Sequence, residues 1–243
     1  MKKPYLRRIE LDRQTIPDDQ SYPFSIPAVR ALDGLDFHPD VTFLVGENGS
    51  GKSTLIEAIA LGMGFGPEGG TKNVHLSSAN DISLLHHHLR FIKSFARPRD
   101  GFFLRAESFY NVATHMDQVG YLGGYGDRSI HARSHGEAFM ATLTGKFRGQ
   151  GLYILDEPEA ALSPSRQLAA LAAIHDLVQL DSQFIIATHS PILMAYPHAT
   201  IILLDETGLR ETTYEETEHY VVMRAFLNNH ERMIQELLAD REG

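Results

Sequence analysis

The sequence predicts an α/β domain built around a largely parallel β-sheet. Short apolar runs, typical of buried parallel strands, alternate with longer segments whose apolar residues recur at helical spacing. One of these strands leads through a glycine-rich turn directly into a helix, and another ends in two adjacent acidic residues. At 243 residues, the chain suits one domain with room for a small subdomain.

Composition and charge narrow the classes of protein that the chain can represent. Hydrophobic residues make up 43% and charged residues 22%, which is ordinary for a soluble domain with a core. The absence of cysteine excludes disulfides and thiolate metal sites, and it agrees with a reducing, cytoplasmic location. A net charge of −9 argues against a protein that coats nucleic acid indiscriminately, but it leaves room for a local basic face.

We expect neither a signal peptide nor an integral membrane segment. The N-terminal MKKPYLRRIELD has basic residues but no apolar stretch after them. Residues 182–204 carry no formal charge and would be long enough to span a bilayer. Because this segment contains two prolines and two histidines, two buried strands around a short helix explain it better.

The N-terminal half begins with an alternating strand and a long connection. In YLRRIEL, residues 5–11, apolar and charged residues alternate as in an edge or half-exposed strand. Residues 12–30 contain three prolines and are expected to form a loop or hairpin connection. The spacing then predicts a buried strand at 41–45, a helix at 53–63, a glycine- and asparagine-rich loop at 64–81, a helix at 82–96 and a strand at 101–109.

Regular alternation returns in the C-terminal half, after a loosely structured stretch at 117–136. Strands are expected at 152–155, 184–188 and 200–204. Helices are expected at 137–147, 164–180 and 218–240. This order of strands and helices indicates that most strands of the sheet run parallel.

The strongest chemical signal is G-E-N-G-S-G-K-S, Gly46–Ser53, which matches the phosphate-binding pattern G-x-x-x-x-G-K-[ST]. It stands between a buried strand and a helix, the context that the motif requires, whereas an ordinary glycine-rich turn would need neither the lysine nor the serine. The backbone N–H groups and the helix N-terminus would cradle phosphates, Lys52 would reach the β- and γ-phosphates, and Ser53 would bind Mg²⁺. The expected ATP contacts are Gly46, Glu47, Asn48, Gly49, Ser50, Gly51, Lys52, Ser53 and Thr54.

A second motif, L-Y-I-L-D-E-P-E, places acidic residues directly after a buried strand. Asp156 is suited to hold Mg²⁺ or its water shell, and Glu157 to take a proton from an attacking water. Alone, the motif would also suit a turn with solvated carboxylates. The phosphate-binding motif upstream favours the catalytic interpretation.

The order of these motifs resembles the ABC-ATPase superfamily over nearly the whole chain. Within that resemblance, I-I-A-T-H-S-P is similar to the strand whose histidine touches the γ-phosphate, which assigns this role to His189. R-S-H-G-E-A occupies the place of the ABC signature, so Ser134, Gly136 and Glu137 would contact the ATP of a partner chain. A helix capping box, with a serine N-cap and a glutamate three residues later, would explain the same residues. A helix N-terminus is itself an anion site, so the capping role and the ATP contact are compatible.

Two positions depart from the ABC pattern. Glu107, in F-L-R-A-E-S-F-Y, stands where a glutamine is usual, so it is either a contact to Mg²⁺ or its water, or a plain carboxylate at the end of a strand. Ser163 stands where transporter domains usually have an aspartate that communicates across the dimer.

The resemblance implies a single head domain over residues 1–243, with a parallel core, an antiparallel β region near the N-terminus and a helical subdomain at about 108–150. It also implies an ATPase that uses Mg²⁺ and works as a homodimer enclosing two ATP molecules. The S-x-G-E form resembles the SMC, RecF and overcoming-lysogenization-defect branch, which suggests a nucleic-acid or defence process with a partner effector. The alternatives are the nucleotide-binding subunit of an ABC transporter and a slowly hydrolysing nucleotide switch.

Three further features are expected to be structural. His86, His87 and His88 would diverge by about 100° each on a helix and so could not share a metal. The acidic stretch around 211–218 suggests a solvated face. The basic-aromatic stretch at 90–105 suits either an amphipathic helix running into a strand, which we favour, or a surface that binds nucleic acid.

Overall fold

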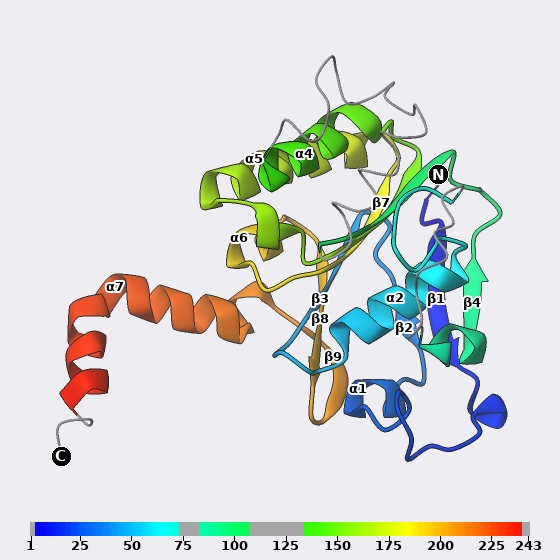
Figure 1. Ribbon diagram of the computed structural model, residues 1–243, viewed down its shortest axis with the longest axis horizontal. Coiled ribbons are helices and arrows are strands. Elements are labelled where there is room, and N and C mark those ends of the chain that lie inside the picture. The colour runs from blue at the N-terminus through cyan, green and yellow to red at the C-terminus, as the bar shows by residue number, and fades with distance from the viewer. Residues whose placement is uncertain (1–2, 73–82, 107–133, 240–243) are drawn as a thin grey trace.

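The structure is a computed structural model that describes residues 3–72, 83–106 and 134–239. Its centre is a six-stranded sheet of order β5-β6-β7-β3-β8-β9 (Figure 1). The first five strands run parallel, and β9 returns antiparallel to β8. The strand bounds are β3 Val41–Val45, β5 Asp100–Arg105, β6 Gly151–Asp156, β7 Gln183–Ala187, β8 Thr200–Asp205 and β9 Gly208–Thr212. The predicted α/β fold with a mainly parallel sheet is confirmed.

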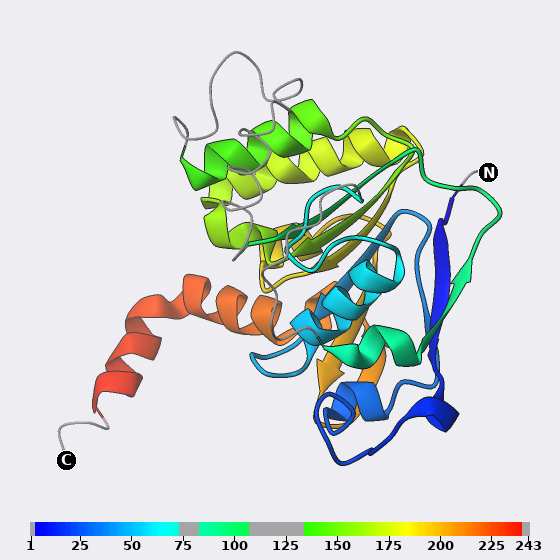
Figure 2. The same cartoon turned by 45° about the vertical axis from the view of Figure 1, so that its right-hand side comes forward.

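Both faces of the sheet are covered, which explains why its inner strands are mostly apolar. Every residue of β3, β6 and β7 is buried. In β3, Val41 and Phe43 belong to one core cluster and Leu44 to the other, because successive side chains point to opposite faces. Helix α2, Lys52–Gly62, covers one face, and α5, Pro164–Gln179, covers the other (Figures 1 and 2).

A separate three-stranded antiparallel sheet lies on the α2 side (Figure 2). Its central strand is β1, Leu6–Leu11, flanked by β2, Leu35–Asp36, and β4, Leu89–Lys93. The expected antiparallel region near the N-terminus is therefore present. Strand β1 is the central strand of this sheet, so the edge alternative was wrong, but it is half-exposed as the alternating pattern suggested, with Leu6, Ile9 and Leu11 buried and Arg7 exposed.

The prediction of a helix over 82–96 was wrong. Leu84–His88 forms a short 3₁₀ helix, and Leu89–Lys93 is strand β4, which pairs with β1. Leu85, Leu89 and Ile92 imitate a helical period because a buried 3₁₀ turn is followed immediately by a half-buried strand. The backbone partner that decides between the two structures lies some 80 positions away in β1, beyond any local pattern.

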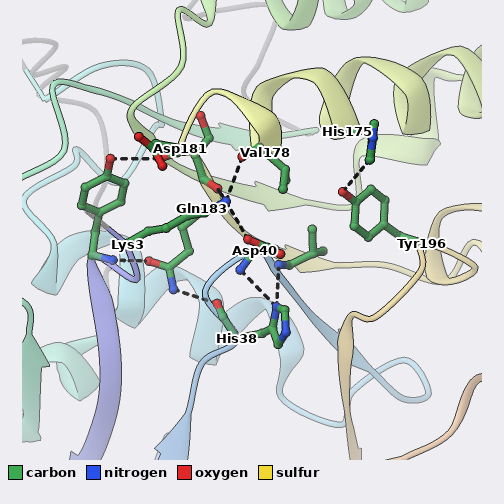
Figure 3. Close-up of polar contacts among 11 residues, drawn as sticks. Lys3, His38, Asp40, His175, Val178, Asp181, Gln183 and Tyr196 are labelled. Atoms are coloured by element: carbon green, nitrogen blue, oxygen red, sulfur yellow. Dashed lines mark hydrogen bonds and ion pairs between the residues drawn. The ribbon is translucent and has the colours of Figure 1, made fainter. Parts of the chain in front are cut away.

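The two sheets are joined by one buried glutamine, Gln183, at the start of β7 (Figure 3). Its Oε1 accepts hydrogen bonds from the N–H groups of Tyr5 (2.8 Å) and Leu6 (3.0 Å). Its Nε2 donates to the carbonyls of Leu6 (2.8 Å) and His38 (3.1 Å). Close by, Lys3 pairs with Asp40 at 2.6 Å, so the N-terminal segment is fixed to the sheet by polar contacts as well as by packing.

The remaining α-helices connect successive strands or follow the last strand. They are α1 Pro27–Arg30, α4 His135–Ala141 (continued by a π-helical turn at Thr142–Lys146), α6 Pro191–Met194 and α7 Glu218–Ala239. Helix α7 matches the predicted C-terminal helix, except that its backbone breaks at Asn229, and it projects away from the sheet (Figure 1). Most of the expected subdomain at 108–150 lies outside the described residues. No helix in the described part of the chain has the length and apolarity to cross a membrane.

The basic-aromatic stretch at 90–105 lies mainly on strands β4 and β5, where a helix running into a strand was favoured. Several of its side chains make contacts within the fold. Arg105 forms a 2.6 Å ion pair with the buried Glu57, and Phe102 and Phe103 lie in the core. Lys93 donates to the carbonyl of Gly62 at 3.0 Å. These contacts account for Lys93, Phe102, Phe103 and Arg105, whereas Phe95, Arg97 and Arg99 are exposed.

The histidines at 86–88 contact neighbouring side chains, and the acidic residues at 211–218 lie on the surface. The rings of His86 and His87 lie 3.9 Å apart, and His88 Nδ1 is 2.8 Å from Thr15 Oγ1. Within residues 3–72, 83–106 and 134–239, no group of three histidine or acidic side chains is arranged to hold a metal. The acidic residues at 211, 215, 216 and 218 are all exposed, as expected.

Candidate functional site

The glycine-rich loop connects the carboxyl end of β3 to the first residue of α2, as the motif predicted. Gly46, Gly49 and Gly51 have φ values of 150°, 83° and 98°, a region that disfavours side chains. At Gly46 a Cβ would also lie 2.2 Å from the carbonyl oxygen of Leu204. The close approach of this loop to β8 therefore requires glycine.

Lys52 is the first residue of α2 and is 4% exposed. Its Nζ donates to the carbonyls of Gly46 (2.9 Å) and Glu47 (2.8 Å), so the ammonium group lies inside the loop. Burial lowers the pKa of Lys52, and the carboxylate of Glu157 opposes this shift. The buried hydroxyl of Ser50 has no hydrogen-bond partner among the described residues. A cationic loop with an unpartnered hydroxyl fits a phosphate group.

Asp156 ends strand β6 and lies beside the loop. It is 5% exposed, and its Oδ1 accepts a 3.3 Å hydrogen bond from Ser53 Oγ. Parallel strands end at the same edge of the sheet, which brings these two residues together across 103 positions of sequence. A hydroxyl beside a carboxylate is the kind of oxygen donor set that Mg²⁺ accepts when it also binds nucleotide phosphates.

Glu157 and His189 complete the same edge. Glu157 has a left-handed backbone, with φ 51° and ψ 52°, and its N–H donates to the carbonyl of Ala187 at 2.9 Å. Its Oε1 lies 3.6 Å from His189 Nε2, a buried atom that makes no hydrogen bond within the described part of the chain. Left-handed backbone at a non-glycine residue is uncommon and concentrates at functional sites.

Glu159 fixes the backbone of this histidine. Its Oε1 accepts a 2.5 Å hydrogen bond from the His189 N–H. Burial raises the pKa of Glu159, and that hydrogen bond opposes the shift. The second glutamate of D-E-P-E thus supports the segment after β7 that carries His189, a role that the motif did not suggest.

The predicted signature residues lie on a different part of the molecule. Ser134 caps α4, which packs beside α5 and apart from α2 in both views (Figures 1 and 2). The capping box is formed: Glu137 N–H donates to Ser134 Oγ (3.4 Å), and Ser134 N–H donates to Glu137 Oε2 (2.9 Å). Both side chains are exposed. A Cβ at Gly136 would lie 2.5 Å from the carbonyl oxygen of Ala161, so this turn requires glycine.

Arg166 is a contact of the signature turn that the sequence did not indicate. Its guanidinium donates to Ser134 Oγ and pairs with Glu137 Oε1, each at 3.3 Å. The departures from the ABC pattern have different outcomes. Ser163 caps α5 by accepting from the Arg166 N–H at 3.4 Å, whereas Glu107 lies outside the described residues.

A cavity of about 760 Å³ adjoins the glycine-rich loop. Its wall is formed by residues 45–50, by the turn between β8 and β9, and by the start of α7. Near the start of α2, Tyr22 Oη lies 3.2 Å from Thr54 Oγ1. Ligand-sized space therefore exists next to the residues that the motif assigns to phosphate.

Comparisons with known proteins find similarity to an AAA domain and to ATP-binding proteins. Residues 23–105 match the family model described as "AAA domain". The vitamin B12 import ATP-binding protein BtuD of Vibrio atlanticus is 29% identical over 203 residues, which cover 71% of this chain and 77% of that protein. The energy-coupling factor transporter ATP-binding protein EcfA2 of Methanospirillum hungatei is 27% identical, covering 78% of this chain. The chain spans about half the length of that relative, 52%.

Among solved structures, the SMC head domain from Thermotoga maritima matches 86% of this chain and 99% of its own, with 16% identity and a TM-score of 0.45. The loop between β3 and α2 and the acid that ends β6 fit the P-loop class of fold, and residues 23–105 match an AAA domain. Within that class, the order of the motifs resembles that of ABC-type ATPases, and the two curated relatives are ATP-binding proteins of that kind.

Proposed function

We propose that this protein binds ATP with Mg²⁺ and hydrolyses it within a homodimer that encloses two nucleotides. The observation that carries the proposal is the convergence of Lys52, Ser53, Asp156, Glu157 and His189 at one edge of the sheet. Their chemistry matches the parts of a P-loop ATPase: a phosphate-binding cation, oxygen ligands for a metal, a carboxylate base and a group for the γ-phosphate.

The loop holds the triphosphate. The backbone N–H groups of residues 46–51 and the N-terminus of α2 favour negative charge, and Lys52 adds a full positive charge beside them. Ser53 and Thr54, the next residues of the helix, would also contact the phosphates of the same ATP molecule. ATP is expected to draw the Lys52 ammonium away from the two loop carbonyls that it now contacts.

Ser53 and Asp156 would hold Mg²⁺, with Glu107 as a further candidate near the metal or its water. When bound, the ion would neutralise charge on the β- and γ-phosphates. The position of Asp156 supports this role, because its Oδ1 lies 3.3 Å from the Ser53 hydroxyl and both oxygens could bind one ion.

Glu157 is the proposed general base, and His189 the contact to the γ-phosphate. The carboxylate of Glu157 takes a proton from the attacking water, which raises the nucleophilicity of that water. His189 Nε2 faces Glu157 and is buried without another partner among the described residues, so it has a hydrogen bond available for a phosphate oxygen.

The site is completed by a second chain. Ser134 and Glu137 are exposed on α4, apart from the loop of their own chain, which supports a role toward the nucleotide of a partner together with Gly136. Two chains placed head to tail use the same surfaces twice, so they form a closed two-fold dimer. Hydrolysis removes a phosphate group that both chains contact, and the dimer then loosens.

The process that this cycle drives is proposed to be nucleic-acid-related or defensive, with nucleic acid or an effector protein as partner, inside the cytoplasm. The S-H-G-E turn supports this choice. The second candidate is the nucleotide-binding subunit of a transporter, which the names of the two curated relatives favour. In either case we propose that residues 1–243 act as one head domain, with a helical subdomain at about 108–150.

Phosphate release by the purified protein tests the proposal. Turnover per chain should require Mg²⁺ and should rise with protein concentration before it saturates, because two monomers must meet to complete a site. Turnover that does not change with protein concentration would remove the dimer from the mechanism. Undetectable release across the whole concentration range would contradict the ATPase assignment itself.

A further inference from the structure

His219, in the first turn of α7, lies beside the proposed γ-phosphate site. Its Nε2 lies 2.9 Å from Nδ1 of His189, and the two rings are 5.1 Å apart at 59°. Beyond this turn, residues 221–230 are all exposed and α7 leaves the body of the molecule (Figure 1). The histidine pair is therefore a specific contact at the root of a projecting helix.

Only one hydrogen can lie between the two nitrogens of the histidine pair. Burial and the charge of Lys52 lower the pKa of His189, and burial lowers the pKa of His219, so both rings are neutral at pH 7. A neutral imidazole has one N–H group and one bare nitrogen. In the 2.9 Å contact, one ring must therefore donate and the other must accept.

The surroundings of His189 decide which ring donates. Its Nε2 faces the Glu157 carboxylate, an acceptor without a proton to give, at 3.6 Å. A hydrogen on Nε2 would face this carboxylate, which favours the tautomer of His189 with Nε2–H and a bare Nδ1. It follows that His219 Nε2–H is the donor and His189 Nδ1 the acceptor.

We propose that His219 is a positioning residue whose hydrogen bond holds His189 in one tautomer and one ring orientation, with Nε2–H presented to Glu157 and the γ-phosphate. This inference rests on the proposed function for its effect on turnover. A simple packing role for His219 would anchor α7 without selecting a tautomer. The second nitrogen of a functional histidine is commonly fixed by such a partner.

Three variants separate positioning from packing. His219→Leu replaces the ring with an apolar side chain of similar size and removes the donor. The kcat for ATP should then fall on the order of tenfold. KM should stay unchanged, because the loop and Lys52 hold the nucleotide. His219→Gln restores an N–H donor near the position of Nε2 and should recover much of the loss. His230→Leu, an exposed histidine on the same helix, is the matched control and should behave as the wild type.

The tautomer itself can be read without turnover, by nitrogen NMR of the imidazoles in the nucleotide-free protein. His189 should be protonated at Nε2 in the wild type and in His219→Gln, and it should become a mixture of tautomers in His219→Leu. An unchanged tautomer in His219→Leu, or a kcat in His219→Gln as low as in His219→Leu, would overturn the positioning role. If the wild type shows the tautomer dependence but releases no phosphate, the proposed ATPase fails and the histidine pairing stands.

Discussion

Glu157→Gln is expected to slow ATP hydrolysis by roughly 10²–10⁴-fold while ATP binding is retained. Glutamine preserves the shape of the side chain but cannot accept the proton of the attacking water. Phosphate release and a calorimetric titration with Mg-ATP measure the two quantities separately. Glu215→Gln, which alters an exposed acid outside the site, is the control and should leave both unchanged.

The same substitution should trap the dimer. With hydrolysis blocked, the γ-phosphate that both chains contact persists, so Glu157→Gln should be dimeric with Mg-ATP and monomeric without nucleotide. Light scattering reads this mass change directly. Wild-type turnover in this variant would exclude Glu157 as the base. A molar mass that is the same with and without Mg-ATP would exclude the nucleotide-dependent dimer.

Lys52→Ala should abolish measurable ATP binding and leave the fold intact. Nζ of Lys52 contacts two loop carbonyls, so its removal takes a cation from the phosphate site without opening the core. Calorimetric titration measures affinity, and thermal unfolding followed by circular dichroism measures the fold. Lys93→Ala, on strand β4 of the other sheet, is the control. Unchanged affinity in Lys52→Ala would contradict the assignment of the loop.

The parallel sheet and the loop could be predicted because their physical causes are local in sequence. Strands β3, β6 and β7 are buried on both faces, so their sequences are short, mostly apolar runs. The loop needs glycine where φ is positive, and the motif therefore records the backbone geometry directly. Asp156 could be placed beside Ser53 because parallel strands end together.

Other elements depend on partners that are distant in sequence. Leu89–Lys93 is a strand because β1 lies beside it, and the segment read alone resembled a helix. Strand β9 was missed because its charged residues face solvent and only its pairing with β8 makes it a strand. Gln183, a polar residue at the start of an apolar run, gave no sign that it joins two sheets.

Within the site, the missed residues are those that support others. Glu159 holds the His189 backbone, Arg166 contacts the signature turn, and His219 meets the His189 ring. Each comes from an element whose position is fixed only by the folded chain. A motif records the groups that touch a ligand, whereas supporting groups require only a suitable atom at a suitable place.

The most direct test of the two-chain site is to mix two inactive variants. Lys52→Ala alone lacks a working loop in both sites of its dimer, and Ser134→Arg alone places a bulky cation against the partner's γ-phosphate in both. In a mixed dimer, one site pairs the intact loop of the Ser134→Arg chain with the intact signature of the Lys52→Ala chain. Combined in equal amounts before Mg-ATP is added, the two should recover up to about half of wild-type phosphate release, because only mixed dimers can close on ATP and each has one good site of two. A mixture as inactive as its components, from chains that remain folded, would contradict a composite site shared by two copies of this protein.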